Sequence, residues 1–243
     1  MVGSRQFGLS SPYDCHVYAL RSQAGILLID AGSGLATSRI VANLREEFGD
    51  DLSCGGTILV THKHPDHAAG AAALSRELGW PVWTSVHTRD VLVSGDAEAS
   101  GLRDAQAAGG YPSTMACEAC AVAGSFEDGE IVRLEGFELQ AIRVQGHASD
   151  AFAFVCVHDG VRCLFTADIV FYGGVIGLIQ SRDSNLQDYR RDIGKLAGLH
   201  IDALFPGHGL FTLEGGQQHI DAAAAELRKG FVPRCVGQGD LIF

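Results

Sequence analysis

The sequence predicts an α/β protein folded as a four-layer αββα sandwich. Short apolar segments with strand character alternate with amphipathic segments of helical period, and this order occurs in both halves of the chain. Each half would cover one face of a sheet with helices, so we expect the two sheets to pack together with helices outside. The 243 residues, 47% of them hydrophobic, are enough to bury such a core. No Pro- or Ser-rich linker interrupts the sequence, and we expect a single domain over residues 1–243.

The first half opens with two apolar segments joined by the turn "RSQAG", a pattern typical of a β-hairpin. A helical segment follows, with apolar residues at Ile40, Val41, Leu44 and Phe48 and a stop at Gly49. Strand and helix patterns then alternate up to the inserted region. The expected elements are strands at 16–20, 25–30, 57–61 and 81–85, and helices at 35–49 and 68–79.

An inserted cap is expected at about residues 86–124, because this stretch has short helical and loop patterns and little hydrophobic periodicity. The second half returns to apolar β segments, two of them joined by the turn "HDG", and then alternates helix and strand. The expected elements are strands at 130–134, 137–144, 151–157, 161–166 and 201–205, and helices at 185–199 and 214–230.

The composition excludes several classes of partner. The formal net charge of −11 argues against a nucleic-acid or anionic-membrane surface, since phosphate binding relies on Lys and Arg. The N-terminal segment lacks the pattern of a signal peptide, and no run of 18 apolar residues predicts a transmembrane helix. We therefore expect a cytoplasmic protein that acts on a small-molecule substrate. The sequence does not indicate its oligomeric state.

The seven cysteines are irregularly spaced and do not predict a disulfide framework, which also fits a reducing compartment. Cys117 and Cys120 form a single CxxC pair, which is half of a zinc site with no second pair nearby. We interpret them as ordinary thiols of a loop.

Residues of the metal-ligating type follow the ends of several expected strands. "TILVT" leads into the cluster "HKHPDH", and other His or Asp residues end the segments "GILLID", "AIRVQGH", "CLFTAD" and "ALFPGH". Loops at one edge of a rigid sheet are where sites are commonly built. The residues that share this placement are Asp30, His62, His64, Asp66, His67, His147, Asp168 and His208.

More side chains gather here than a single tetrahedral ion can bind, since zinc usually takes four ligands. The set suits two ions, roughly 3.5–4 Å apart, that share a bridging carboxylate and a bridging water. In the cluster, His62 and His64 alternate along an extended segment and can point the same way, whereas Asp66 and His67 can address a second ion. We expect two divalent ions, zinc in the first place, with iron or manganese as alternatives.

"THKHPDH" resembles the HxHxDH signature of the metallo-β-lactamase-fold superfamily, and the later "GH", "AD" and "PGHG" segments follow in that family's order. The resemblance spans residues 14–210 and implies the roles of the individual ligands. It implies that His62, His64 and His147 hold one metal, that Asp66, His67 and His208 hold the other, and that Asp168 bridges them. It also implies that Asp30 supports a ligand histidine by a hydrogen bond.

A site of this kind predicts hydrolysis. A water between two dications ionises near neutral pH, so the bridging hydroxide could attack a carbonyl while Asp66 passes a proton to the leaving group. The substrate expected is a small ester or lactone, because the chain is similar to lactonases with an inserted cap and a tyrosine after the bridging aspartate. Tyr172 stands four residues past Asp168 and could donate a hydrogen bond to the oxyanion, with packing beside the cap as the other interpretation.

Three alternative activities remain open at this point. Thioester hydrolases of the glyoxalase II type share HxHxDH but usually carry a basic C-terminal helical region. Iron-dependent redox members of the fold place the downstream histidine closer to the cluster than His147 lies. True β-lactamases generally lack an aspartate at the position of Asp168.

Overall fold

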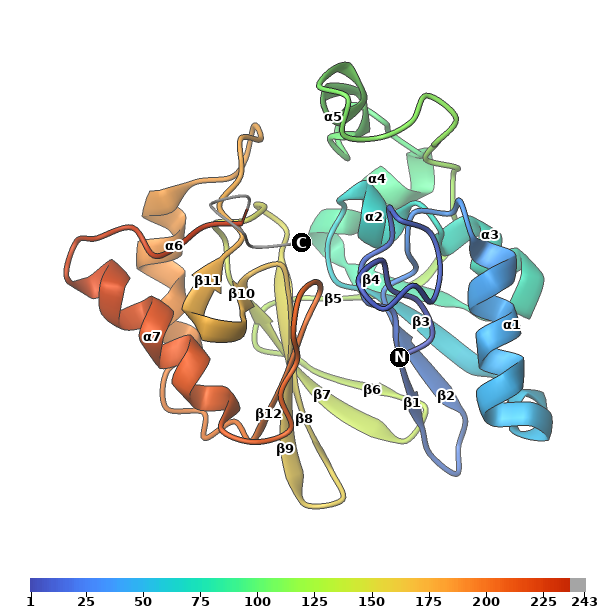
Figure 1. Cartoon of the computed structure of the whole chain (residues 1–243). Coiled ribbons are helices and arrows are strands. Elements are labelled where there is room, and N and C mark those ends of the chain that lie inside the picture. The colour runs from blue at the N-terminus through green and yellow to red at the C-terminus, as the bar shows by residue number, and fades with distance from the viewer. Residues whose placement is uncertain (237–243) are drawn as a thin grey trace. The chain divides into compact units, whose positions relative to one another are not determined.

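The structure is a computed structural model that describes residues 1–236, so residues 237–243 of the expected domain lie outside it (Figure 1). The described chain forms two compact units. The first comprises Met1–Phe126 and Arg133–Phe137, and the second comprises Glu127–Val132 and the chain from Glu138 onward. Each unit has its own hydrophobic core, and the strands form two five-stranded sheets and one two-stranded sheet within the described residues.

The sheet of the first unit has the strand order β1-β2-β3-β4-β5. Its strands are β1 (Tyr18–Arg21), β2 (Ile26–Ile29), β3 (Gly56–Val60), β4 (Val82–Ser85) and β5 (Val122–Phe126). The first two form the predicted antiparallel hairpin, whereas β2, β3, β4 and β5 run parallel to one another. Since the carboxyl ends of parallel strands meet at one edge, the loops after β2 and β3 start side by side.

Helices α1 (Thr37–Phe48) and α3 (Ala71–Leu78) supply apolar residues to the core of the first unit. Ile40 and Leu44 of α1 and Leu74 of α3 pack in one cluster with Ile58 and Val60 of β3. The remaining helical segments are η1 (Gly49–Cys54), α2 (Pro65–Ala68), α4 (Val86–Ser94) and α5 (Leu102–Ala107). Most of the region expected as a cap is therefore short helix and loop, as its weak periodicity indicates.

The sequence analysis missed β5, whose segment "VAGSF" starts inside the expected cap. Gly124 lies against the ring of Trp83 on the adjacent strand β4, where an added Cβ would stand 2.4 Å from Cζ2 of that ring. A glycine inside a strand often marks such a close approach, and here it weakens the local strand pattern. The strand forms because β4 offers it a partner.

The second sheet has the strand order β12-β9-β8-β7-β6. Its strands are β6 (Ile131–Leu134), β7 (Phe137–Arg143), β8 (Phe152–His158), β9 (Val161–Ala167) and β12 (Ala203–Pro206). Strands β7, β8 and β9 form an antiparallel meander, whereas β12 lies parallel to β9. The loops that follow β9 and β12 therefore emerge at the same edge of this sheet.

One cluster of the second unit joins strand residues to α6 (Leu186–Asp192), η3 (Ile193–Leu196) and α7 (Gly216–Arg228). Tyr189, Ile193 and Leu196, within the predicted helix at 185–199, are buried in one cluster with Val155 and Leu204. A short hairpin of β10 (Val170–Phe171) and β11 (Val175–Ile176), connected by η2 (Tyr172–Gly174), lies beside α7 (Figure 1). Within residues 1–236, no helix has the length and hydropathy required to cross a bilayer.

Candidate metal centre

The cluster "HKHPDH" begins directly after β3 and turns into α2. Pro65 occupies the first turn of that helix, where its missing N–H costs nothing, and His64 is the residue before it. The amide of His67 donates to the carbonyl of His64 at 3.0 Å, which closes the turn. The chain thus changes from non-helical backbone at His62 and His64 to helix at Asp66 and His67.

This change brings the three histidine rings together. The ring of His62 lies 4.8 Å from that of His64 and 4.3 Å from that of His67, centroid to centroid. All three side chains are buried. Asp66 faces the same region, with one carboxylate oxygen 3.7 Å from Nε2 of His67. The four members of the cluster therefore form one group of potential ligands within the first unit.

Asp30, at the end of β2, supports this group. One of its carboxylate oxygens accepts a hydrogen bond from the Thr61 amide at 2.8 Å, and the other lies 2.8 Å from Nδ1 of His67. The Thr61 hydroxyl donates to Asp30 at 3.1 Å and lies 2.9 Å from Nδ1 of His62. Asp30 has the positive φ of 66° that aspartate tolerates better than most residues. Its carboxylate contacts one histidine directly and reaches another through Thr61.

His147, Asp168 and His208 lie together in the second unit. One oxygen of Asp168 is 3.6 Å from Nε2 of His147 and 3.4 Å from Nε2 of His208. Asp168 and His208 follow the parallel strands β9 and β12, and the Gly207 amide donates to the Ala167 carbonyl at 2.7 Å. The carboxylate therefore stands between two imidazoles, an arrangement suited to a bridging ligand.

The backbone of Gly177 orients His147, because its carbonyl lies 2.6 Å from Nδ1 of that ring. A carbonyl only accepts hydrogen bonds, so Nδ1 carries the proton and Nε2 keeps its lone pair. The carboxylate of Asp30 acts on His67 in the same way. Metal-ligating histidines generally have their second nitrogen held by such an acceptor, and the donor set therefore fits a divalent metal such as zinc.

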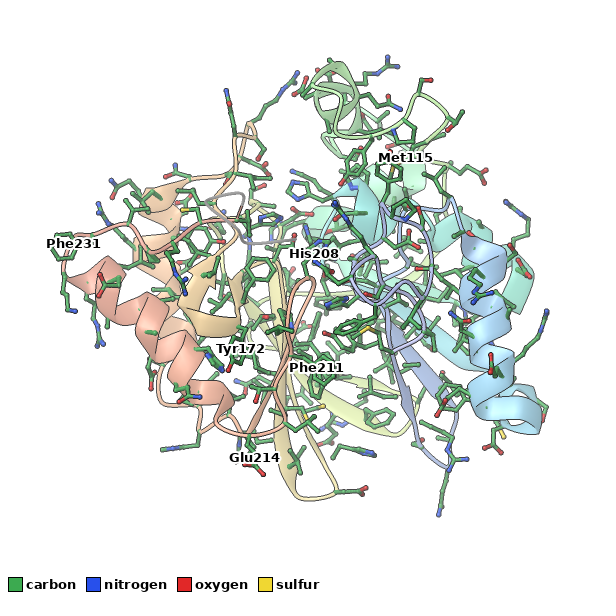
Figure 2. All side chains as sticks on the ribbon, in the orientation of Figure 1. Met115, Tyr172, His208, Phe211, Glu214 and Phe231 are labelled. Carbon is green, nitrogen blue, oxygen red and sulfur yellow. The ribbon has the colours of Figure 1, made fainter. Side chains whose placement is uncertain are left out.

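Tyr172 is placed differently from the metal-ligand candidates. Its ring lies tilted against that of His219 of α7, with centroids 4.2 Å apart, and the residue is 45% exposed (Figure 2). The Gly173 amide donates to Nδ1 of His219 at 3.0 Å, which holds this short turn against the helix. The catalytic role expected for Tyr172 remains a prediction.

Three residues of the site escaped the sequence analysis: Thr61, Gly177 and Tyr189. Thr61 directly precedes the histidine cluster in the sequence, and Gly177 acts through its backbone carbonyl, which no side-chain pattern marks. Tyr189 carried no separate signal, because its helical spacing with apolar residues is typical of a core position. Each contributes through a partner that is distant in sequence or through its backbone.

The cysteines of the CxxC pair and Cys15 lie in different surroundings. The Cys117 thiol lies 3.3 Å from the Ser100 hydroxyl, and the Cys120 thiol contacts a backbone carbonyl of its own loop. Burial raises the pKa of both thiols, which keeps them protonated. Cys15 is fully buried beside Asp30 and His67, and burial raises its pKa strongly as well.

Comparison with known proteins places this arrangement in a family. The family model for the metallo-beta-lactamase superfamily matches residues 11–208, a range that includes all seven candidate ligands. Solved structures with the same fold include a metallo-beta-lactamase from Cronobacter sakazakii (TM-score 0.68, 21% identity, 90% of this chain and 88% of that chain). Another is the subclass B3 enzyme BJP-1 of Bradyrhizobium japonicum (TM-score 0.66, 21% identity, 89% and 85%). The predicted metallo-β-lactamase fold is confirmed.

The similar curated proteins include thioester hydrolases. The atrochrysone carboxyl ACP thioesterase of Aspergillus fumigatus is 27% identical over 206 residues, which are 84% of this chain and 53% of the relative. The hydroxyacylglutathione hydrolase GloC of Haemophilus influenzae is 28% identical over 169 residues, 66% of this chain and 72% of the relative. The chain spans about half the length of the fungal relatives that it matches.

Proposed function

Because the chain belongs to the metallo-beta-lactamase superfamily, we propose that it is a metal-dependent hydrolase that cleaves a carboxylic thioester. The observation that carries the proposal is the hydrogen bonding of two candidate ligand histidines. The Nδ1 atoms of His67 and His147 face a carboxylate and a carbonyl, so the Nε2 atoms are available as ligands. Histidines held in this way are typical of a metal centre rather than of a packed core.

The proposed centre contains two divalent ions, zinc in the first place. His62, His64 and His147 would hold one ion, Asp66, His67 and His208 would hold the other, and Asp168 would contact both. Family membership supports this assignment, as does the grouping of the ligands within each unit. In the second unit, Asp168 already contacts both histidines through a single oxygen.

Divalent ions supply two effects when bound: they polarise a carbonyl and lower the pKa of water from about 15.7 to about 7. The residues of the chain orient the metal ligands and transfer the proton. His62, His67 and His147 keep fixed ring orientations through Thr61, Asp30 and Gly177. The Asp66 side chain is less buried than that of His67, and its carboxylate would accept the proton of the attacking hydroxide and pass it to the leaving group. No serine or cysteine nucleophile is required.

The thioester is favoured over the oxygen ester or lactone by two observations. Relatives of two kinds, a fungal acyl-carrier-protein thioesterase and hydroxyacylglutathione hydrolases, are named for thioester substrates. The lactone prediction depended partly on Tyr172, whose ring contacts the ring of His219 on α7. A thiolate is also a better leaving group than an alkoxide, so it needs less help from a general acid.

The test is a substrate panel with protein loaded with zinc. Acyl-glutathione, acyl-CoA and acyl-pantetheine thioesters are compared with aryl esters, lactones and phosphodiesters. We expect the highest kcat/KM on one of the thioesters, with loss of turnover in His64→Ala. His158→Ala, which alters an exposed histidine of the β8–β9 hairpin, is the matched control and should keep the activity.

Preferred hydrolysis of lactones or aryl esters would retain the metal-dependent reaction but overturn the thioester assignment. Equal turnover by His64→Ala would assign the activity to a contaminant. Metal analysis of the purified protein tests the ions separately: about two zinc ions per chain support the proposal, whereas a coloured iron centre would favour a redox member of the fold.

A further inference from the structure

Tyr189 of α6 is fully buried, and its hydroxyl reaches backbone beside two candidate ligands. The phenol oxygen lies 3.1 Å from the carbonyl of Ile169 and 3.3 Å from the carbonyl of Asp168. A phenol carries its proton at neutral pH, and it therefore serves as the donor to these carbonyls. The hydroxyl is thereby tied to the turn that carries Asp168.

The turn of Asp168 is packed against the segment that orients His147. The carbonyl of Gly177 in this segment lies 2.6 Å from Nδ1 of His147. This segment is tightly packed, since a Cβ on Gly177 would stand 1.9 Å from the Asp168 carbonyl oxygen. The Tyr189 hydroxyl therefore holds a turn that lies directly against the backbone partner of His147.

The ring of Tyr189 contacts the loop before His147 as well. A Cβ on Gly146 would stand 2.4 Å from the ring, so only glycine fits there. The carbonyl of Gly146 accepts hydrogen bonds from the Asn185 amide at 2.8 Å and the Ser184 hydroxyl at 2.9 Å. At the other end of α6, Asp192 accepts from the Gln145 amide at 3.1 Å. The helix and the residues just before it hold this loop from both sides.

We propose that Tyr189 is a positioning residue that sets His147 and Asp168 relative to each other through its hydroxyl. The proposal rests on the metal centre proposed above. A tyrosine that only filled the core would need its ring and one partner for its hydroxyl. Here the hydroxyl lies within hydrogen-bond distance of two carbonyls, and both belong to the turn that carries Asp168.

Tyr189→Phe tests the hydroxyl, because it keeps the ring against Gly146 and removes the oxygen. Zinc affinity is measured by competition with a chromophoric chelator. We expect a 10- to 100-fold loss, the range observed when a group that orients a ligand is removed. The Co²⁺-substituted protein should also show altered visible absorption, since the ligand field depends on the placement of His147 and Asp168.

Ile193→Val is the matched control, because it removes one methyl group from the same buried cluster and its side chain has no hydrogen bond to lose. It should lower stability modestly while zinc affinity and the Co²⁺ spectrum stay at the wild-type values. Loss of zinc affinity in both variants to the same degree would overturn the positioning role and indicate a general effect of stability.

A second measurement does not need the metal. Amide hydrogen exchange in the metal-free protein should become faster at Gly177 in Tyr189→Phe, while the central amides of β8 keep their protection. Unchanged exchange at Gly177, together with wild-type zinc affinity and an unchanged Co²⁺ spectrum, would overturn the proposal and leave the proposed hydrolase intact. A wild-type protein that binds no zinc would overturn both.

Discussion

The Nδ1 atom of His67 lies 2.8 Å from a carboxylate oxygen of Asp30, and both side chains are almost completely buried. The two residues are 37 positions apart, and they meet because β2 and β3 are parallel neighbours whose carboxyl ends share one edge. The carboxylate determines which imidazole nitrogen carries the proton. The other ring nitrogen, Nε2, therefore keeps a lone pair that can bind a metal ion.

We predict that Asp30→Asn weakens zinc binding about 10- to 100-fold, the cost of removing such an orienting group. Asparagine tolerates the positive φ of this position, so the backbone should be retained. The measurement is zinc affinity by chelator competition.

Asp14→Asn is a matched control for that variant. Asp14 is a buried carboxylate in the same unit, and it accepts hydrogen bonds from the amide and hydroxyl of Ser33 rather than from a histidine. It should lower stability without a change of zinc affinity. Equal loss of affinity in both variants would contradict the role assigned to Asp30.

Gly177→Ala is predicted to destabilise the second unit by about 1–3 kcal/mol or more, because overpacking forces a backbone shift. The new Cβ would stand 1.9 Å from the Asp168 carbonyl and 2.8 Å from Nδ1 of His147, so zinc affinity should fall as well. Urea denaturation of the metal-free protein and zinc competition measure the two effects.

Gly194→Ala provides the comparison for this steric effect. No atom lies within 4 Å of the position of its Cβ, and its backbone is not left-handed. The change should leave stability within about 1 kcal/mol of wild type or raise it, because alanine restricts the unfolded chain. Similar losses in both glycine variants would refute the steric explanation.

Stability should depend on pH through His219. Burial lowers the pKa of this histidine below its ordinary value of 6.5 in the folded state. Between the folded and unfolded pKa values the unfolded chain binds the extra proton, so this contribution to stability is complete above about pH 6.5 and declines as the pH falls. The maximal slope is about 1.36 kcal/mol per pH unit for one proton.

His219→Asn isolates that contribution, because its amide oxygen can still accept from the Gly173 amide but does not titrate. Urea unfolding from pH 5 to pH 8 should give wild-type and variant free energies that converge as the pH falls. Curves that stay parallel over this range would show that His219 does not titrate on unfolding.

Tyr172→Phe tests the catalytic role predicted from the sequence. A hydroxyl that donates to the developing oxyanion should contribute about 10²–10³-fold to kcat, as other such donors do. The measurement is kcat on the best thioester of the panel. Wild-type kcat in the variant would assign Tyr172 to packing against His219, in agreement with the ring contact.

Removal of the metal should reveal how far the centre stabilises the fold. Zinc at 100 times its Kd adds about 2.7 kcal/mol to the unfolding free energy if only the folded state binds it. We expect the melting temperature of the wild type to fall on treatment with a chelator and to recover with zinc. His208→Ala should show a smaller difference, and an equal one would exclude His208 as a ligand.

Much of the architecture follows from local sequence patterns. The hairpin of β1 and β2, helix α1 with its stop at Gly49, and the meander from β7 to β9 were predicted because each depends on periodicity and turn residues within a short segment. Strand β5 was not predicted because its formation depends on contacts with β4. Its backbone pairs with β4, and Gly124 lies against the ring of Trp83, and neither contact is visible in a local sequence pattern.

The sequence by itself determined the fold class, the family and which histidines and aspartates could bind metal, because ligand types and hydrophobic periods are properties of neighbouring residues. Only the tertiary structure decided which atoms hold these ligands in place. The hydrogen bonds from His67 to Asp30 and from His147 to Gly177, and the bond from Tyr189 to the turn of Asp168, join residues 20 to 37 positions apart. Such partners depend on how strands and helices pack, and no local pattern encodes that.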